Sequence, residues 1–326
     1  MSVLTLSKAI NTGLRHALED DPKVVVMGQD VGGLGGVFRV TDGLQKDFGS
    51  ERVIDTPLAE ASIVGTAIGL ALRGYRPVCE IQFDGFVYPA FSQIVSQLAK
   101  MRARSNGLLA MPVVIRIPVG GGIGAVEHHS ESNEAYFAHT AGLRVVCCSN
   151  PADAHWMLRQ AVRSDDPVIF YEPKRRYWSK AEVDESAAAR VLPLDRARIV
   201  RAGRDLTLLT YGGMVQTCLD AAEAAIADGR DIEVVDLRTL SPLDLDTITA
   251  SVSRTGRCVV AHEAPTFAGL GAEIGSAVTE RCFYRLEAPV LRVGGFNTPY
   301  PPSKVEDQYL PDLDRVLDTV DRAFAY

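Results

Sequence analysis

Residues 113–119 have the sequence VVIRIPV, and residues 24–27 have the sequence VVVM. Both runs are almost continuously apolar, which is typical of strands that lie in a parallel sheet covered on both faces. Further strand-like runs alternate along the chain with stretches of helical periodicity. Because such alternation favours a parallel sheet packed between helices, the sequence predicts an α/β fold.

This alternation also predicts how the chain is divided. In the first part, the expected strands are residues 24–27, 52–55, 77–83, 112–118, 144–148 and 168–172, and the expected helices are residues 5–19, 60–72, 88–104 and 152–163. Between Pro173 and Arg204 the chain is charged and has no long apolar run, and the alternation resumes at residue 206. For a chain of 326 residues, we predict a domain at residues 1–185, a linker at residues 186–203 and a second α/β domain at residues 204–326.

Composition narrows the function classes. Lys and Arg number 34 and Asp and Glu number 41, a net charge of −7, which disfavours binding to nucleic acid or to an anionic membrane surface. No apolar run approaches the roughly 20 residues of a membrane helix, and the N-terminus lacks the basic region and apolar core of a signal peptide. The six cysteines show no C-x-x-C spacing. They are typical of reduced, buried thiols in a cytoplasmic protein, or one of an organelle matrix.

Common cofactor motifs are absent. There is no Gly-Lys dipeptide and therefore no P-loop, and the glycine clusters at residues 32–36 and 120–124 lack the spacing of a dinucleotide-binding turn. Zinc-ligand spacings are missing as well, so no residue of this chain is assigned to a metal. The sequence therefore predicts an enzyme-like fold without a complete phosphate cradle.

A carboxylate stands at a strand-to-helix connection. Residues 52–60 have the sequence RVIDTPLAE, in which a short strand enters a proline turn and Glu60 opens an apolar helix. Glu60 either complements the helix dipole, a contribution of about 0.3–1 kcal/mol, or holds a ligand at the carboxyl edge of a parallel sheet, where α/β proteins bind their ligands.

Aromatic residues gather in the sequence QFDGFVYPAF at residues 82–91. They follow a strand and precede an amphipathic helix, so they either pack in the core or present Phe86 to a flat ligand ring.

Two adjacent histidines, His128 and His129, follow the glycine cluster at residues 120–124. Adjacent side chains diverge, which disfavours a shared metal ion. Because histidine titrates near neutral pH, a general acid or base is the functional interpretation and a solvated loop the alternative. His139 is interpreted as a structural histidine on a helix.

Together these segments resemble the beta subunit of thiamine-diphosphate-dependent 2-oxo acid dehydrogenases. In the first part, the matching segments are MGQDV at 27–31, GGVFR at 35–39, TPLAE at 56–60, EIQF at 80–83, PAF at 89–91, HS at 129–130 and FYEP at 170–173. In the second part, they are VDLRT at 235–239, TGR at 255–257, HEAP at 262–265 and LEAP at 286–289. The resemblance covers essentially the whole chain.

The resemblance implies a thiamine diphosphate pyrimidine-binding domain followed by a transketolase C-terminal-like domain. It also implies an alpha subunit as partner, in a tetramer of two alpha and two beta chains with the cofactor between unlike chains. The alpha chain would hold magnesium and the diphosphate through a Gly-Asp-Gly motif, which this chain lacks. A lipoylated dihydrolipoamide acyltransferase would receive the acyl group.

The resemblance also assigns site residues. Glu60 matches the glutamate that hydrogen-bonds the aminopyrimidine ring and favours the imino tautomer, whose nitrogen removes the thiazolium proton. Leu58, Gln82 and Phe86 match positions that line this ring. His129 matches the histidine that faces the reacting carbon and assists proton movement during acyl transfer.

Two features of the match leave chemistry open. The family often has Gly-Glu-Asp where this chain has Gly28-Gln29-Asp30, so any network that needs an ionised glutamate at this position differs here. A monovalent cation held by backbone carbonyls after the fourth strand would leave no side-chain signature, so none is assigned.

The substrate and the functional class also have alternatives. The segments around Phe38, Glu172 and His262 look most like the branched-chain type, and pyruvate or acetoin is the alternative substrate. A non-catalytic assembly module is the alternative from another class, against which the intact Glu60 and His129 argue.

Overall fold

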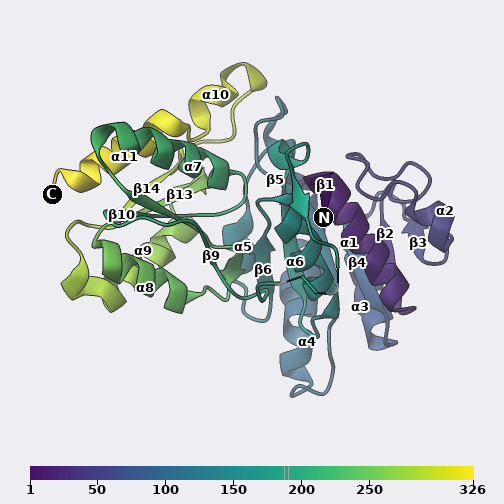
Figure 1. The fold of residues 1–326 in the computed structure, drawn as a ribbon. Coiled ribbons are helices and arrows are strands. Elements are labelled where there is room, and N and C mark those ends of the chain that lie inside the picture. The colour runs from purple at the N-terminus through teal and green to yellow at the C-terminus, as the bar shows by residue number, and fades with distance from the viewer. Residues whose placement is uncertain (187, 190) are drawn as a thin grey trace.

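The computed structural model describes residues 1–186, 188–189 and 191–326, and its two larger sheets lie side by side (Figure 1). The first sheet has seven strands in the order β12-β6-β7-β5-β4-β2-β3. Their bounds are β2 (Val24–Gly28), β3 (Val53–Asp55), β4 (Arg76–Glu80), β5 (Val114–Val119), β6 (Arg144–Cys147), β7 (Val168–Pro173) and β12 (Thr239–Ser241). All neighbours pair in parallel except β12 with β6. The predicted α/β class is confirmed.

Helices cover both faces of this sheet. On one face lie α1 (Leu6–Asp20) and α6 (Pro151–Arg163), which pack against each other and against apolar strand residues such as Val26 and Val114. On the other face lies α3 (Glu60–Leu72), in a core with Met27 and Ile115. Successive strand residues thus enter opposite cores, which is why β2 and β5 are buried along their whole length.

Shorter elements complete the first part of the chain. They are β1 (Ser2–Thr5), which pairs antiparallel with β8 (Lys180–Val183), and the helices α2 (Leu44–Phe48) and α5 (Glu134–Ala138).

The expected helix at residues 88–104 is wrong as a single element. The structure has a 3₁₀ segment η1 (Asp84–Ala90), a π-helical segment η2 (Gln93–Leu98) and α4 (Ala99–Arg104). Pro89 lies within the first segment, and a proline is tolerated in the first turn of a helix. The expected α-helix is interrupted further on, where Gln93–Leu98 form π-helical hydrogen bonds. The expected apolar face persists because Ile94 and Leu98 are buried.

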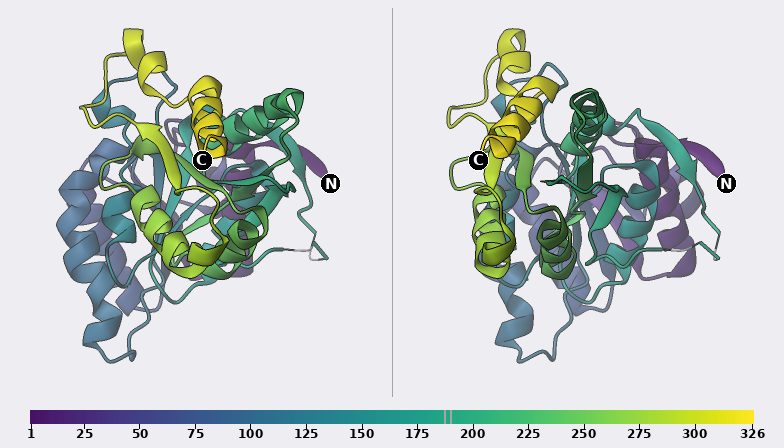
Figure 2. Two further views of the ribbon diagram at one scale, coloured as in Figure 1. Left: turned by 90° about the vertical axis from the view of Figure 1, so that its left-hand side faces the viewer. Right: turned by 60° about the vertical axis from the view of Figure 1, so that its left-hand side comes forward.

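The second sheet has five strands in the order β14-β13-β10-β11-β9. Their bounds are β9 (Arg198–Arg201), β10 (Leu206–Thr210), β11 (Ile232–Asp236), β13 (Cys258–Pro265) and β14 (Leu291–Gly295). Figures 1 and 2 show helices on both sides of it. These are α7 (Met214–Ala224) and α11 (Leu313–Phe324) on one side, and α8 (Leu245–Thr255) and α9 (Leu270–Cys282) on the other, while α10 (Glu306–Tyr309) lies outside them.

The two parts of the chain exchange structure across their junction. β12 follows β11 but pairs with β6 of the first sheet, and one apolar core runs from Ile115 to Val260 in the second sheet. β9 lies within the segment expected to be a linker and pairs antiparallel with β11. The two parts are therefore joined by paired strands and a shared apolar core, and not only by the connecting segment.

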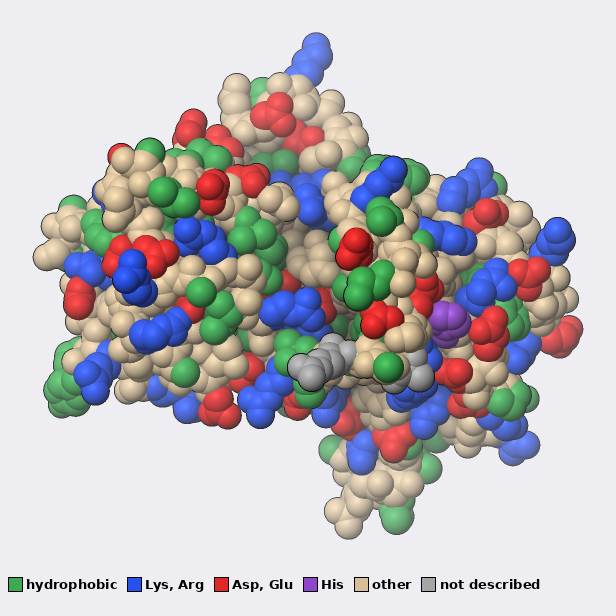
Figure 3. Space-filling model, in the orientation of Figure 1, with side chains coloured by type: hydrophobic (Ala, Val, Ile, Leu, Met, Phe, Trp, Pro, Cys, Tyr) green, Lys and Arg blue, Asp and Glu red, His purple; other side chains and the backbone are tan. Residues whose placement is uncertain are grey.

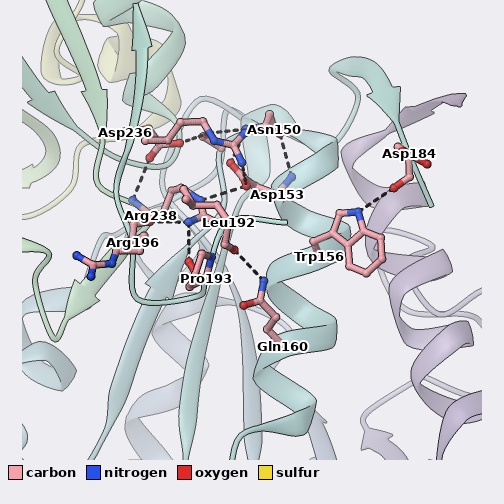
Figure 4. Close-up of polar contacts among 12 residues, drawn as sticks. Asn150, Asp153, Trp156, Gln160, Asp184, Leu192, Pro193, Arg196, Asp236 and Arg238 are labelled. Atoms are coloured by element: carbon pink, nitrogen blue, oxygen red, sulfur yellow. Dashed lines mark hydrogen bonds and ion pairs between the residues drawn. The ribbon is translucent and has the colours of Figure 1, made fainter. Parts of the chain in front are cut away.

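Polar contacts pin the connecting segment to α6 (Figure 4). The indole of Trp156 donates to the Asp184 carbonyl at 2.8 Å, and the amide of Gln160 donates to the Leu192 carbonyl at 3.0 Å. Arg238 is fully buried and donates to Asp153 at 3.1 Å. Residues 187 and 190 of the expected linker lie outside the described residues.

The surface carries charges of both signs (Figure 3), and the cysteines are unpaired. On the face drawn in Figure 3, acidic and basic side chains are interspersed. All six cysteines are buried and free, as expected. In the described part of the chain, no helix is long and apolar enough to cross a bilayer.

Candidate active site

The carboxyl ends of three neighbouring strands meet at one edge of the first sheet. Gly28 at the end of β2 is in register with Asp55 at the end of β3 and with Glu80 at the end of β4. The connections that leave these ends carry Glu60 and Gln82. The sheet register therefore brings the predicted cofactor residues to the edge at which α/β folds bind ligands.

Glu60 is the first residue of α3, and its side chain is partly buried. The preceding turn is fixed because the Thr56 amide donates to the Gly28 carbonyl at 3.0 Å. Among the described residues, none forms a hydrogen bond with the Glu60 carboxylate. Beside it in the turn, Leu58 is 65% exposed. The turn thus presents a free carboxylate and an uncovered apolar side chain close together in the sequence.

Gln82 lies two residues beyond β4 and is held against the loop that follows β2. Its side-chain amide donates to the Asp30 carboxylate at 3.2 Å and to the Gln29 carbonyl at 3.4 Å. Gln29, where the family often has glutamate, therefore contacts Gln82 through its backbone. This particular contact does not depend on whether residue 29 can ionise.

The rings of Phe86 and His129 lie close together. The His129 ring centroid lies 5.2 Å from that of Phe86 and 4.1 Å from that of Phe83. Close approach of the two segments requires a glycine, because a Cβ atom on Gly85 would lie 2.6 Å from the backbone of His128. Since α3 also packs on η1, the element that carries Glu60 contacts the element that carries Phe86.

The environment of His129 favours its neutral form. Partial burial is the largest cause that lowers its pKa below the usual 6.5, followed by the neighbouring His128 and Lys174, while Glu127 acts in the opposite direction. A neutral imidazole at pH 7 has a lone pair with which it can accept a proton.

A buried charge cluster lies behind this edge. The Arg116 guanidinium on β5 donates to Glu172 at 2.6 and 2.9 Å and to Glu80 at 2.7 Å, and the Tyr177 hydroxyl donates to Glu172 at 2.8 Å. Sequence reasoning missed this cluster. The available signal was a charged residue inside each of three apolar strands, which is tolerated only where charges are paired.

A second ion pair supports the aromatic residues. Lys174 donates to Asp84, and both side chains are fully buried. The Lys174 ammonium also lies 5.7 Å from the centroid of the Phe83 ring, which packs on His129. Lys174 therefore affects His129 both through its charge and through the ring that positions it.

The glycine-rich loop at residues 120–124 belongs to the first part of the chain but is bound by residues of the second part. The Glu306 carboxylate accepts hydrogen bonds from the Gly122 and Gly124 amides, both at 2.9 Å, and from the Tyr300 hydroxyl at 2.6 Å. This loop leads directly to His129, so residues of the second sheet's domain help to position it.

A cavity of about 140 Å³ lies between the two parts of the chain beside Ser130. Its polar lining includes Tyr88, Glu131, Asn133, Glu263, Tyr300 and Tyr309. Ser130 directly follows His129, so residues from both parts of the chain line the space next to the His129 loop.

Comparison with known proteins agrees with this arrangement. The family model described as "Transketolase, pyrimidine binding domain" matches residues 2–179, and "Transketolase, C-terminal domain" matches residues 195–316. A protein of Leifsonia xyli subsp. xyli named "Pyruvate dehydrogenase E1 component subunit beta" is 62% identical over 323 residues, covering 99% of this chain and 95% of that protein. This chain belongs to the transketolase-like family of 2-oxo acid dehydrogenase E1 beta subunits.

Further relatives agree with this E1 beta assignment. A protein of Mycobacterium tuberculosis named "3-methyl-2-oxobutanoate dehydrogenase subunit beta" is 54% identical over 320 residues, covering 98% of this chain and 91% of that protein. A solved structure titled "Split gene transketolase, inactive beta4 tetramer" matches with a TM-score of 0.78 at 23% identity and covers 99% of this chain and 98% of its own, which shows the fold. The resemblance found in the sequence is confirmed at the level of family and fold.

The residues at the sheet edge fit the aminopyrimidine end of thiamine diphosphate. The groups at this edge are one free carboxylate (Glu60), one side-chain amide (Gln82) and the apolar side chains of Leu58 and Phe86. A flat heteroaromatic ring with polar edges needs such a combination of apolar contact and a few placed polar groups. The sequence contains no Gly-Asp-Gly motif.

Proposed function

We propose that this E1 beta chain supplies the aminopyrimidine half of a thiamine diphosphate site and works with an alpha subunit that supplies magnesium and the diphosphate ligands. The observation that carries the proposal is the free Glu60 carboxylate at the start of α3, next to exposed Leu58. Apolar surface and an unpartnered carboxylate at a ligand-binding edge are consistent with a site that a second chain completes.

Each residue has a separate role in this proposal. Glu60 accepts a hydrogen bond from the ring, and Leu58, Gln82 and Phe86 hold and orient it. When bound, the cofactor supplies the nucleophilic carbon that attacks the 2-oxo acid and the electron sink that permits loss of carbon dioxide. A carboxylate that favours one tautomer of the ring acts as a positioned acid–base group, an effect of about 10²–10⁴ in rate.

His129 would move the proton that accompanies transfer of the acyl group to a lipoyl arm. Its lowered pKa and its contacts with Phe83 and Phe86 support this role, because a neutral imidazole held by two rings has a lone pair in a defined direction. The acceptor in this proposal is a lipoylated dihydrolipoamide acyltransferase, and the assembly is two alpha and two beta chains.

For the substrate, we propose branched-chain 2-oxo acids. The aromatic side chains packed around His129 offer apolar contact to a branched acyl group, and the Mycobacterium relative is named for 3-methyl-2-oxobutanoate. Pyruvate is the second candidate, because the relative at 62% identity is named for it. One extra or missing methylene in an apolar pocket is worth about 1–3 kcal/mol, or about 10–200-fold in specificity, so the rates on the two substrates should differ measurably.

The test compares the beta chain alone with the beta chain co-expressed with its alpha subunit. Decarboxylation is followed with an artificial electron acceptor on 3-methyl-2-oxobutanoate and on pyruvate. We expect no turnover by the isolated chain, turnover by the complex, and a kcat/KM at least tenfold higher for the branched acid. Turnover by the chain alone would contradict the half-site, a preference for pyruvate would contradict the substrate, and a silent complex would favour a non-catalytic assembly module.

A further inference from the structure

Two histidines and a glutamate meet where α1 and α6 pack together, on one face of the first sheet. His16 comes from α1, His155 from α6, and Glu185 from the segment that follows β8. One ring nitrogen of each histidine and one carboxylate oxygen lie within 4.8 Å of one another. The helices approach closely here because Gly13 sits one turn from His16, and a Cβ on Gly13 would lie 3.1 Å from the His155 carbonyl.

Hydrogen bonds fix the tautomer of His155. Its Nδ1 lies 3.0 Å from the Thr12 hydroxyl and 3.4 Å from the Ala9 carbonyl. A carbonyl only accepts, and the Thr12 hydroxyl donates its own proton to Ala9, so Nδ1 carries the hydrogen. The lone pair of this imidazole is therefore on Nε2.

That lone pair has no partner in the described part of the chain, although His155 is fully buried. The Nδ1 atom of His16 is likewise buried without a partner there, and the two rings meet edge to face with centroids 5.3 Å apart. Buried polar atoms are nearly always satisfied, so two unsatisfied ring nitrogens at one point indicate a missing ligand. A histidine whose other nitrogen is held by an acceptor has the orientation typical of a metal ligand.

The connecting segment places the carboxylate. Asp184 is fixed by the Trp156 indole, which donates to its carbonyl (Figure 4), and the Ser186 amide donates to its side chain at 3.0 Å. Because Trp156 directly follows His155, the same turn of α6 positions both the buried histidine and the segment that carries Glu185.

We propose that His16, His155 and Glu185 form a binding site for a divalent transition-metal ion, with zinc as the best match. Two imidazoles and one carboxylate, with a fourth position left to water, are a common zinc ligand set. His16 and Glu185 are only partly buried, so solvent can reach that fourth position. Ligand atoms around tetrahedral zinc are about 3.3 Å apart, so binding draws these side chains together by about 1.5 Å at most.

The surrounding charge permits a cation. Arg159 lies one turn after His155, and its guanidinium donates to the Asp20 carboxylate at 2.9 Å and lies 4.7 Å from the Trp156 ring centroid. Arg159 shares the Asp20 carboxylate with Arg163, whose guanidinium also lies 2.9 Å from it, so the negative charge at the cluster itself comes from Glu185. Metal binding would join α1, α6 and the start of the connecting segment at one point, which makes this a structural site independent of the proposed catalysis.

The test uses the full-length chain, co-expressed with its alpha subunit, stripped with a chelator and titrated with zinc against a chromophoric competitor. We expect one zinc per beta chain. We expect at least tenfold weaker binding in Glu185→Gln and in His16→Ala, because changes in outer-shell partners alone already cost 10–100-fold. Thr12→Val, which removes the nearer of the two acceptors for His155, should weaken binding about tenfold.

His139→Ala is the matched control, because His139 is an exposed histidine at the end of α5, outside the cluster. It should leave zinc affinity unchanged. Glu185→Gln keeps the test decisive if the helix variants fold poorly, since it changes a partly buried side chain on a connecting segment. The absence of stoichiometric zinc binding, or an affinity within twofold of wild type in both ligand variants, would overturn the proposal.

Discussion

Replacing Arg116 with methionine should destabilise the chain far more than the same change at a surface arginine. Arg116 is fully buried between Glu80 and Glu172, and the Met side chain has a comparable length but no charge. The variant leaves two carboxylates in the sheet interior without a cation. Breaking a buried ion pair by removing one partner costs about 3–5 kcal/mol of unfolding free energy.

Arg102→Met is the matched control. The Arg102 guanidinium pairs with Asp166 at 2.7 Å, the same distance that separates Arg116 from Glu80, but its side chain is 43% exposed. Exposed pairs contribute about 0–1 kcal/mol. The two variants share the residue change and a 2.7 Å contact, and they differ in burial and in the number of carboxylates that lose a partner, two for Arg116 and one for Arg102.

The pH dependence supplies a further check on Arg116→Met. Burial raises the pKa of Glu80, while Arg116 is the main influence that lowers it. Without Arg116 the pKa of Glu80 rises further above its unfolded value, so the folded state binds more protons and loses stability as pH rises through that pKa. The penalty should therefore be larger at pH 8 than at pH 5.

Urea unfolding followed by circular dichroism, at fixed protein concentration, measures these differences. We expect a loss of about 3–5 kcal/mol for Arg116→Met at pH 8 and about 1 kcal/mol or less for Arg102→Met. Equal losses in the two variants, or a penalty for Arg116→Met that shrinks as pH rises, would refute the reasoning.

Two further predictions concern the His129 side of the site. Gly85→Ala should lower both the urea midpoint and the decarboxylation rate, because its Cβ would meet the His128 backbone at 2.6 Å, whereas Gly65→Ala in α3, with nothing within 4 Å, should be neutral or stabilise by up to about 1 kcal/mol; similar effects of both changes would contradict the close contact. His128→Gln should raise the pKa of His129, because the Coulombic effect of His128 that lowers it is removed, and should move the acidic limb of the lipoyl-acylation pH profile to higher pH; an unchanged or lower limb would argue against this.

Local patterns predicted the fold well where one segment carried the whole signal. The run VVIRIPV is β5, buried along its length, and Glu60 begins α3 as the sequence indicated. The segment at residues 84–104 differs because amphipathic spacing specifies which side chains are buried and not which helical hydrogen bonds form. Residues 91–104 stay helical, but the hydrogen bonds over Gln93–Leu98 are π-type, so the predicted single helix is divided into a 3₁₀ segment, a π segment and a short α-helix.

Features made by distant residues could not be predicted in the same way. Arg116 was visible as a charge in an apolar strand, but its partners lie 36 and 56 residues away. The strand β12 leaves the second sheet to pair with β6, an exchange that no local period encodes. His16, His155 and Glu185 come from three separate elements, so their meeting leaves no ligand spacing in the sequence.

Glu60 is the carboxylate that we propose this chain contributes to a site completed by an alpha subunit. Its role is tested by the decarboxylation rate of the alpha–beta complex carrying Glu60→Gln, with an artificial electron acceptor in place of the lipoyl arm. We expect a loss of at least about 10²-fold in kcat while the complex stays assembled, since glutamine keeps the shape and loses the acid–base function. A rate within twofold of wild type would contradict it.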